Sequence, residues 1–61
     1  MATDRVPFVF FGADGSAHEV DLRGDVATTG LLILNATDGL TPFSQRRIVE
    51  RFFEAVYNLE D

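Results

Sequence analysis

The sequence predicts a single small α+β domain, in which an N-terminal β-hairpin is packed by two α-helices. Three observations support this fold class: an Asp-Gly dipeptide between two strand-like segments, a helical apolar periodicity near the C-terminus, and a length of only 61 residues. The expected segments are a flexible lead over residues 1–5, a hairpin over 6–23, a helix or strand over 25–38 and a helix over 42–59. If the middle segment is a strand, the fold becomes a three-stranded antiparallel sheet with one C-terminal helix.

The hairpin is predicted by two strand-like segments that flank an Asp-Gly turn. Val6 to Phe11 is rich in β-branched and aromatic residues, and Ala17 to Arg23 alternates apolar with charged side chains. If Asp14 and Gly15 form a two-residue type I′ loop, one face of the hairpin enters the core. This predicted core face holds Pro7, Val9, Phe11, His18, Val20 and Leu22, and the opposite face holds Phe8, Phe10, Glu19 and Asp21. A shift of one residue in the loop exchanges the two faces.

The middle segment is predicted to be a helix, with a strand as the alternative. Its apolar run, Leu31 to Leu34, is too short for periodicity to distinguish the two. Asp25 is a suitable N-cap, and Gly39 followed by Leu40 is typical of a Schellman C-terminus. Gly30 opposes the helix by about 1 kcal/mol relative to Ala, because glycine loses the most backbone freedom in a helix.

The last helix shows the strongest periodicity in the chain. Thr41 is a capping residue, and Pro42 is favoured in the first helical turn. The apolar residues form two adjacent stripes, which are Ile48, Phe52, Val56 and Leu59 in one and Val49, Phe53 and Tyr57 in the other. Two pairs on the polar side have the spacing of ion pairs, namely Arg46 with Glu50 and Arg51 with Glu54. The apolar arc is wider than one hairpin covers.

The chain carries more large apolar side chains than a lone small core needs. It is 46% hydrophobic, with six Phe and one Tyr, a composition that excludes intrinsic disorder. A chain this short buries only about 60% of its unfolded surface, and it has no Cys for disulfides, so self-association is the expected further source of stability. We therefore expect a non-enzymatic interaction or assembly module, a homodimer or higher oligomer that also contacts another protein. The expected core comprises Val9, Phe11, Val20, Leu22, Phe52 and Val56, and the candidate interface comprises Phe8, Phe10, Phe53 and Tyr57.

An arginine cluster near the start of the last helix indicates an alternative function. The cluster consists of Arg46, Arg47 and Arg51, and two of these cations lie near a helix N-terminus, where the macrodipole disfavours them. Together with the free amides of the first helical turn, they suit an acidic or phosphorylated partner. A third possibility is an acidic decoy or inhibitor, which requires that carboxylates gather on one face. The carboxylates available for it include Asp4, Asp14, Glu19, Asp21 and Asp25.

Composition and motifs argue against several other classes. The net charge of −5 disfavours nucleic acid and anionic membranes, and no run of about 18 apolar residues indicates a membrane span. The polar start is unlike a signal peptide, so a cytoplasmic location is expected. With one His, no Cys, and serines only at a predicted turn and a helix start, we expect no catalytic residues, cofactor or metal. His18 is instead expected to pack across the two strands.

The segment Phe11 to Leu22 resembles the hairpin in the N-terminal oligomerisation domain of actinobacterial nucleoid-bridging proteins. The shared features are an aromatic residue before the loop, the Asp14-Gly15 turn, and the Glu-apolar-Asp-Leu run that begins at Glu19. The rest departs from that family, because no basic linker and no Arg-Gly-Arg segment are present. The order hairpin, helix, helix also looks like that of small tail-assembly proteins of phages. Both resemblances imply self-association through a small α+β module.

Overall fold

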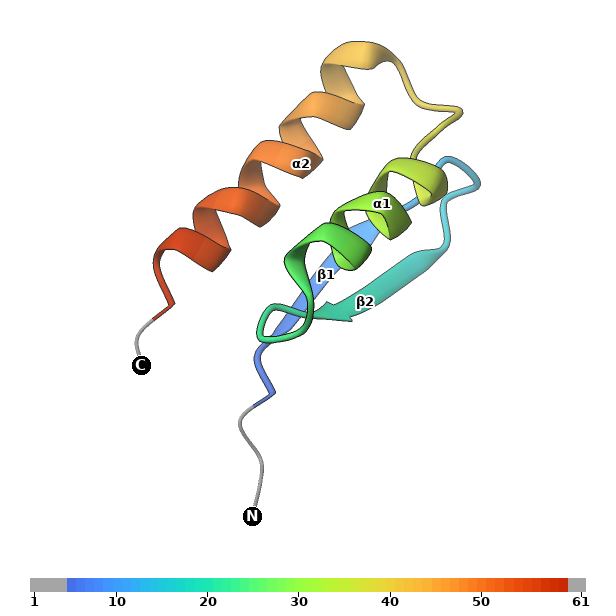
Figure 1. The fold of residues 1–61 in the computed structure, drawn as a ribbon. Helices are drawn as coiled ribbons and strands as arrows, with labels where there is room; N and C mark the ends of the chain where they lie inside the picture. The colour runs from blue at the N-terminus through green and yellow to red at the C-terminus, as the bar shows by residue number, and fades with distance from the viewer. Residues whose placement is uncertain (1–4, 60–61) are drawn as a thin grey trace.

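The computed structural model describes residues 5–59 and contains a hairpin followed by two helices (Figure 1). The elements are β1 (Pro7–Phe11), β2 (Ala17–Asp21), α1 (Val26–Ala36) and α2 (Pro42–Tyr57). The predicted α+β class is therefore confirmed, and the alternative with a third strand is wrong because residues 26–36 are helical. Apart from Arg5, the predicted flexible lead lies outside the described residues.

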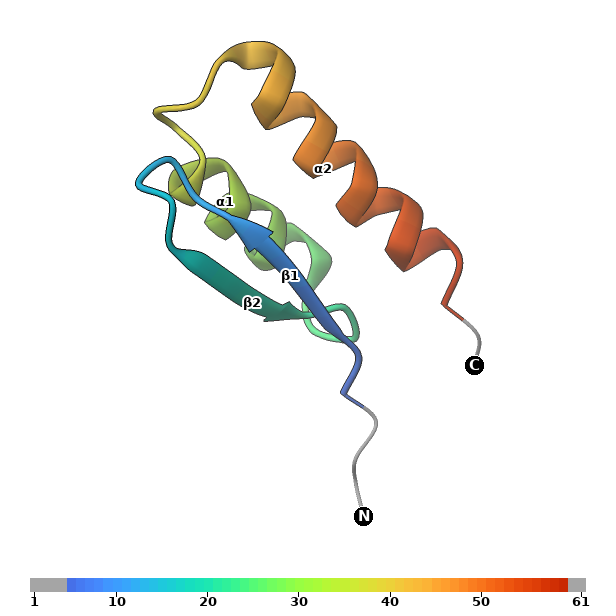
Figure 2. The same ribbon diagram turned by 180° about the vertical axis from the view of Figure 1, so that it is seen from behind.

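The two helices lie together against the hairpin. α1 crosses one face of the two-stranded sheet, and α2 runs beside α1 in the opposite direction (Figures 1 and 2). Seen from behind, the hairpin lies in front of α1, so its other face points away from the helices (Figure 2). The molecule therefore has an outer sheet face and an outer helical face, with the core between the sheet and the helices.

The hairpin loop has three residues, one more than predicted. The Gly12 N–H donates to the Ser16 carbonyl at 2.9 Å, and the Gly15 N–H donates to the Gly12 carbonyl at 3.0 Å. Gly15 has a φ of 86°, and no described residue other than glycine has a positive φ. A two-residue type I′ loop needs two positive φ values, whereas a three-residue loop with a bulge needs only the one that Gly15 supplies. Asp14 therefore does not need to adopt the left-handed conformation.

This longer loop shifts the strand register by one residue and so exchanges the inner and outer faces of β1. Phe8 pairs with Val20 and Phe10 with His18, so the prediction that Val9 shares a face with Val20 is wrong. Phe8 and Phe10 therefore face the core, while Val9 and Phe11, which were predicted to be buried, are 57% and 62% exposed. β2 keeps its predicted orientation, because Val20 and Leu22 still face inward.

The core is small and dominated by two aromatic rings. Its buried apolar residues are Phe10, Leu22, Ile33 and Phe52. The Phe52 ring meets Phe8 edge-on, with 5.7 Å between centroids. His18 stacks on Phe10 at 5.3 Å, so it packs across the strands as predicted, although Phe10 was expected on the opposite face of the hairpin. Each element thus supplies at least one side chain to the cluster.

Both helices begin at the predicted caps, but α1 ends differently from the prediction. Asp25 accepts from the Thr28 N–H at 2.9 Å, and Thr41 accepts from the Ser44 N–H at 3.2 Å. The predicted Schellman ending at Gly39 is wrong, because the C-cap is Thr37 and Gly39 has no positive φ.

Thr37 links the end of α1 to the start of α2. It is fully buried, and its hydroxyl donates to the Ile33 carbonyl at 2.7 Å. The same oxygen accepts from the Gln45 side-chain amide at 3.1 Å, which also donates to the Leu34 carbonyl at 3.1 Å. Gln45 thus supplies a hydrogen bond to a helix-end carbonyl that would otherwise lack one.

We expect the fold to lose stability in acid, because aspartates hold its turns and caps. Hydrogen bonds from Thr28 lower the pKa of Asp25, hydrogen bonds from Ser16 lower the pKa of Asp14, and backbone N–H donors lower the pKa of Asp21. Each folded pKa lies below the ordinary value of 3.8. The stabilisation is therefore present above that value and is lost as the pH falls through the folded pKa values.

Thermal unfolding followed by circular dichroism from about pH 7 to about pH 2 measures this loss. The melting temperature is expected to fall mainly below about pH 4. Asp25→Asn is the matched control, since Asn still accepts the capping hydrogen bond but does not titrate in this range. Its melting temperature should fall less in acid, and an identical pH profile for both proteins would contradict the role of Asp25.

Candidate functional site

The four aromatic residues of the predicted interface separate into two pairs. Phe10 is buried and Phe8 is partly buried, because the register shift turns both toward the core. The prediction that they lie on the outer face of the hairpin is therefore wrong. Phe53 and Tyr57 are exposed on α2. Only this second pair remains available to a partner.

A further apolar surface lies on α1, which the sequence prediction did not single out as an interface. Leu31, Leu32 and Leu34 are 64%, 45% and 44% exposed, and only Ile33 of this helix is a buried apolar residue. None of the 11 residues of α1 is charged. A solvated helix normally carries charged side chains on its outer face. The absence of charge from Val26–Ala36 is the signal in the sequence that marks this surface.

An apolar groove runs between α1 and α2 on this side of the molecule. It has a volume of about 230 Å³. Its lining consists of Val26, Ala27, Gly30, Leu31, Leu34, Val49 and Phe53. Every lining residue is apolar or glycine, so the groove offers shape and hydrophobic contact and no charge.

Gly30 keeps the groove open. A Cβ atom built at this position meets no neighbouring heavy atom within 4 Å, so the packing of the monomer does not require glycine here. Its φ is also negative, as in an ordinary helix. Glycine in a helix interior costs about 0.5–1 kcal/mol relative to Ala. Glycine at position 30 therefore lowers the stability of α1 and leaves an open position on the groove wall.

The arginine cluster does not converge on a common point. Arg46 pairs with Glu50 at 3.2 Å, as predicted, and the Arg47 guanidinium lies 5.8 Å from the centroid of the Phe43 ring. Arg51 is exposed, and the expected ion pair with Glu54 is not formed in the described part of the chain. Arg46 is therefore occupied by Glu50, and the cluster is reduced to Arg47 and Arg51, which lie four residues apart on α2.

Few backbone N–H groups in the first turn of α2 are free to bind an anion. Pro42 has no N–H, the Ser44 N–H is bonded to the Thr41 side chain, and the Gln45 N–H is bonded to the Thr41 carbonyl at 2.9 Å. Phe43 retains the one amide of this turn without such a partner. This capping weakens the predicted phosphate site, which needs several free donors.

Asp14, Ser16 and His18 come together at the hairpin loop, although the sequence prediction treated them separately. Asp14 accepts from the Ser16 N–H at 3.0 Å and from the Ser16 hydroxyl at 2.7 Å. The Ser16 oxygen also lies 3.3 Å from His18 Nε2. The serine proton therefore points to a carboxylate whose pKa is lowered by that same hydrogen bond, and such a carboxylate is a weak base. The cluster therefore holds the hairpin loop through the hydrogen bonds between Asp14 and Ser16.

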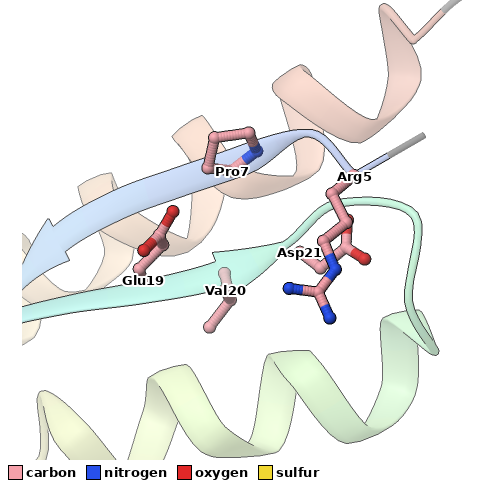
Figure 3. A pocket seen from close by; sticks show the side chains of 5 residues that line it. All are labelled: Arg5, Pro7, Glu19, Val20 and Asp21. Atoms are coloured by element: carbon pink, nitrogen blue, oxygen red, sulfur yellow. The ribbon is translucent and has the colours of Figure 1, made fainter. Parts of the chain in front are cut away.

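A second hollow, of about 350 Å³, lies at the open end of the hairpin (Figure 3). It is lined by Arg5, Pro7, Glu19, Val20 and Asp21. The Asp21 carboxylate accepts from the Val6 N–H at 3.2 Å and from the Arg23 N–H at 3.0 Å. Asp21 therefore links the residue before β1 to the residues that follow β2. The lining carries charges of both signs, and the Asp21 carboxylate already accepts two backbone hydrogen bonds. The hollow therefore does not favour one class of ligand.

Comparison with known proteins adds no family to these observations. No protein family matches the chain, and no curated protein or solved structure is significantly similar to it. Within residues 5–59, no three His, Cys, Asp or Glu side chains are placed to hold a metal ion. No helix in the same part of the chain is long and apolar enough to cross a membrane. Of the two hollows, the groove between the helices is the one whose lining is entirely apolar or glycine.

Proposed function

We propose that this protein is a non-enzymatic interaction and assembly module that self-associates through the groove between α1 and α2. One observation carries the proposal: α1 has no charged residue, yet two of its exposed leucines, Leu31 and Leu34, line the groove together with Phe53 and the open Gly30. Burial of apolar surface is the main driving force for association between proteins. A cytoplasmic location belongs to the same proposal and agrees with a chain that has no Cys.

A second copy suits this surface because the surface is uncharged. The chain has a net charge of −5, so two copies repel each other over most of their surfaces. In a two-fold symmetric contact each patch meets its own copy, and a charged patch would meet charges of its own sign. The groove avoids this cost. On α2 beside it, Arg46 and Glu50 form an ion pair and so contribute no net charge.

The stability of a small domain supports the same reading. The described core contains four buried apolar residues, whereas nine large apolar side chains are exposed. A domain of this size is marginal when it relies on its own core. Covering Leu31, Leu34 and Phe53 in a dimer would move these side chains from water into a second core.

Sedimentation in about 1 M salt tests the groove, because salt screens charged contacts and leaves apolar contacts in place. Leu31→Glu is expected to convert the wild-type dimer to a monomer, since it places a charge in the groove. Leu32→Glu is the matched control, because Leu32 is exposed on the same helix but does not line the groove. The proposal fails if wild-type protein is monomeric, or if both variants change the mass equally.

Gly30→Ala gives an independent test, because it acts on stability and on association in opposite directions. The added methyl group favours the helix by about 0.5–1 kcal/mol, so the melting temperature of the monomer should rise. The same methyl group projects into the open position on the groove wall and should weaken self-association. If association becomes stronger or stays the same, the groove is not the contact surface.

A further inference from the structure

A second surface lies on the side of the hairpin that points away from the helices (Figure 2). Val9 stands opposite Glu19 there, and Phe11 stands opposite Ala17. All four side chains are exposed, and we call them the hairpin face. Asp14 in the adjoining loop adds a carboxylate near one end, and at the other end Asp21 and Arg5 line the same hollow as Glu19. The hairpin face is therefore apolar and acidic.

A complementary surface lies on α2, where Phe43, Arg47 and Arg51 follow one another at intervals of four residues. Residues at this spacing share one side of a helix, so we call the three the arginine face. Phe43 is among the most exposed apolar side chains, and the Arg47 guanidinium lies over its ring. Among residues 5–59, neither Arg47 nor Arg51 forms an ion pair with a carboxylate. The arginine face is therefore apolar and basic.

We propose that the hairpin face of one copy docks on the arginine face of another copy. Phe11 then packs on Phe43, and Glu19 pairs with Arg47 or Arg51. Arginine suits this role because its guanidinium binds a carboxylate through two parallel hydrogen bonds and also stacks on aromatic rings. The acidic partner that the arginine cluster predicts is, on this proposal, the protein itself.

The contact joins different copies because the two faces lie on different parts of the molecule. The hairpin face points away from both helices, and the arginine face belongs to α2. A contact between two unlike surfaces is heterologous, so it extends into rings or open chains and does not close as a dimer. It is separate from the groove, and either contact can exist without the other. Together they would produce assemblies larger than a dimer.

Salt dependence distinguishes this contact from the groove. Two copies with a net charge of −5 repel each other, and low salt strengthens that repulsion. Self-association that nevertheless increases at low salt requires local charge complementarity. The experiment uses the Leu31→Glu variant at about 0.02 M salt, which removes the groove contact and leaves charged contacts unscreened. We expect this variant to self-associate at low salt and to dissociate in about 1 M salt.

Charge reversal then tests the partners directly by sedimentation. In the Leu31→Glu background, Glu19→Arg alone and Arg47→Glu with Arg51→Glu should each weaken self-association at least about tenfold. Mixing the two proteins should restore association, because the reversed hairpin face of one then meets the reversed arginine face of the other. Asp38→Arg is the matched control, an exposed acidic residue outside both faces. It changes the net charge as Glu19→Arg does and should leave association in place.

Three results would overturn the proposal. The first is a Leu31→Glu protein that stays monomeric at low salt, which leaves both faces to a different partner. The second is a mixture of the two reversed proteins that remains monomeric while both show native circular dichroism spectra. The third is an equal loss of association in the Asp38→Arg control. The groove proposal is judged separately, from the measurements at high salt.

Discussion

Phe52→Ala is expected to destabilise the monomer by about 3–5 kcal/mol, the usual cost of removing a buried phenylalanine ring. Phe52 is only 1% exposed and contacts Phe8 edge-on across the core. A domain of this length has a total stability of about 3–9 kcal/mol. The variant should therefore lose from about a third to all of its stability, and far-UV circular dichroism and urea denaturation measure the loss.

Phe53→Ala is the natural control for this prediction, because the two phenylalanines are adjacent on α2 and differ in exposure. Phe53 is 50% exposed and lines the groove. Its removal should leave the helix content intact while weakening self-association in high salt. Equal destabilisation by the two substitutions would mean that Phe52 is not the centre of the core.

The fold class was predictable because local signals agree along most of the chain. Asp25 and Thr41 cap the helices as predicted, and the stripe that contains Phe52 faces the core. The choice of helix for the middle segment rested on the Asp25 cap and on a Schellman ending at Gly39, because an apolar run alone does not distinguish the two states. The helix is correct over residues 26–36, but only the Asp25 cap is present. Such signals act within one or two turns of backbone, and the sequence displays them directly.

The strand register was not predictable from the same signals. An Asp-Gly pair serves both a two-residue loop and a three-residue loop, and the two differ in whether Asp14 needs a positive φ. In the structure Ala13 joins the loop, and its N–H donates to the Ala36 carbonyl at the end of α1 at 3.0 Å. That tertiary bond favours the longer loop. A contact between residues so far apart in sequence leaves no local trace.

Of the four predicted interface residues, two are exposed in the structure and two face the core. Phe53 and Tyr57 follow from helical periodicity, which does not depend on the register. Phe8 and Phe10 depended on the loop and moved to the core with it. The sequence signal for the leucines of α1 was the absence of charge from the helix. An uncharged helix is compatible either with burial in a core or with an interface. Only the packing shows that α1 buries Ile33 and leaves Leu31 and Leu34 outside.

The exposed apolar side chains now belong to separate faces with different chemistry. The groove is uncharged, whereas the hairpin face and the arginine face each combine an exposed phenylalanine with charge of one sign. Apolar contacts persist in salt and charged contacts weaken in it, so ionic strength separates the two modes of association. An assembly that uses both would change its size with salt without changing its fold.

Gly12→Ala is expected to destabilise the fold by about 1–3 kcal/mol, the usual cost of overpacking. A Cβ atom on Gly12 would lie 2.8 Å from His18 Nε2 and 2.9 Å from the Ala36 carbonyl oxygen. The imidazole is held by stacking on Phe10, and the carbonyl already accepts the N–H of Ala13. Either the ring must leave its stack or the end of α1 must move from the loop, and both changes remove native contacts.

Urea denaturation of three glycine variants separates this steric effect from other effects of alanine. Gly15→Ala has open space but a φ of 86°, so its cost is backbone strain of about 1–3 kcal/mol. Gly30→Ala has open space and an ordinary helical φ, so it should stabilise the monomer. Adding His18→Ala to Gly12→Ala removes one of the two close contacts, and the double variant should lose less stability than the sum of the single variants. A purely additive loss would show that His18 does not press on the loop at Gly12.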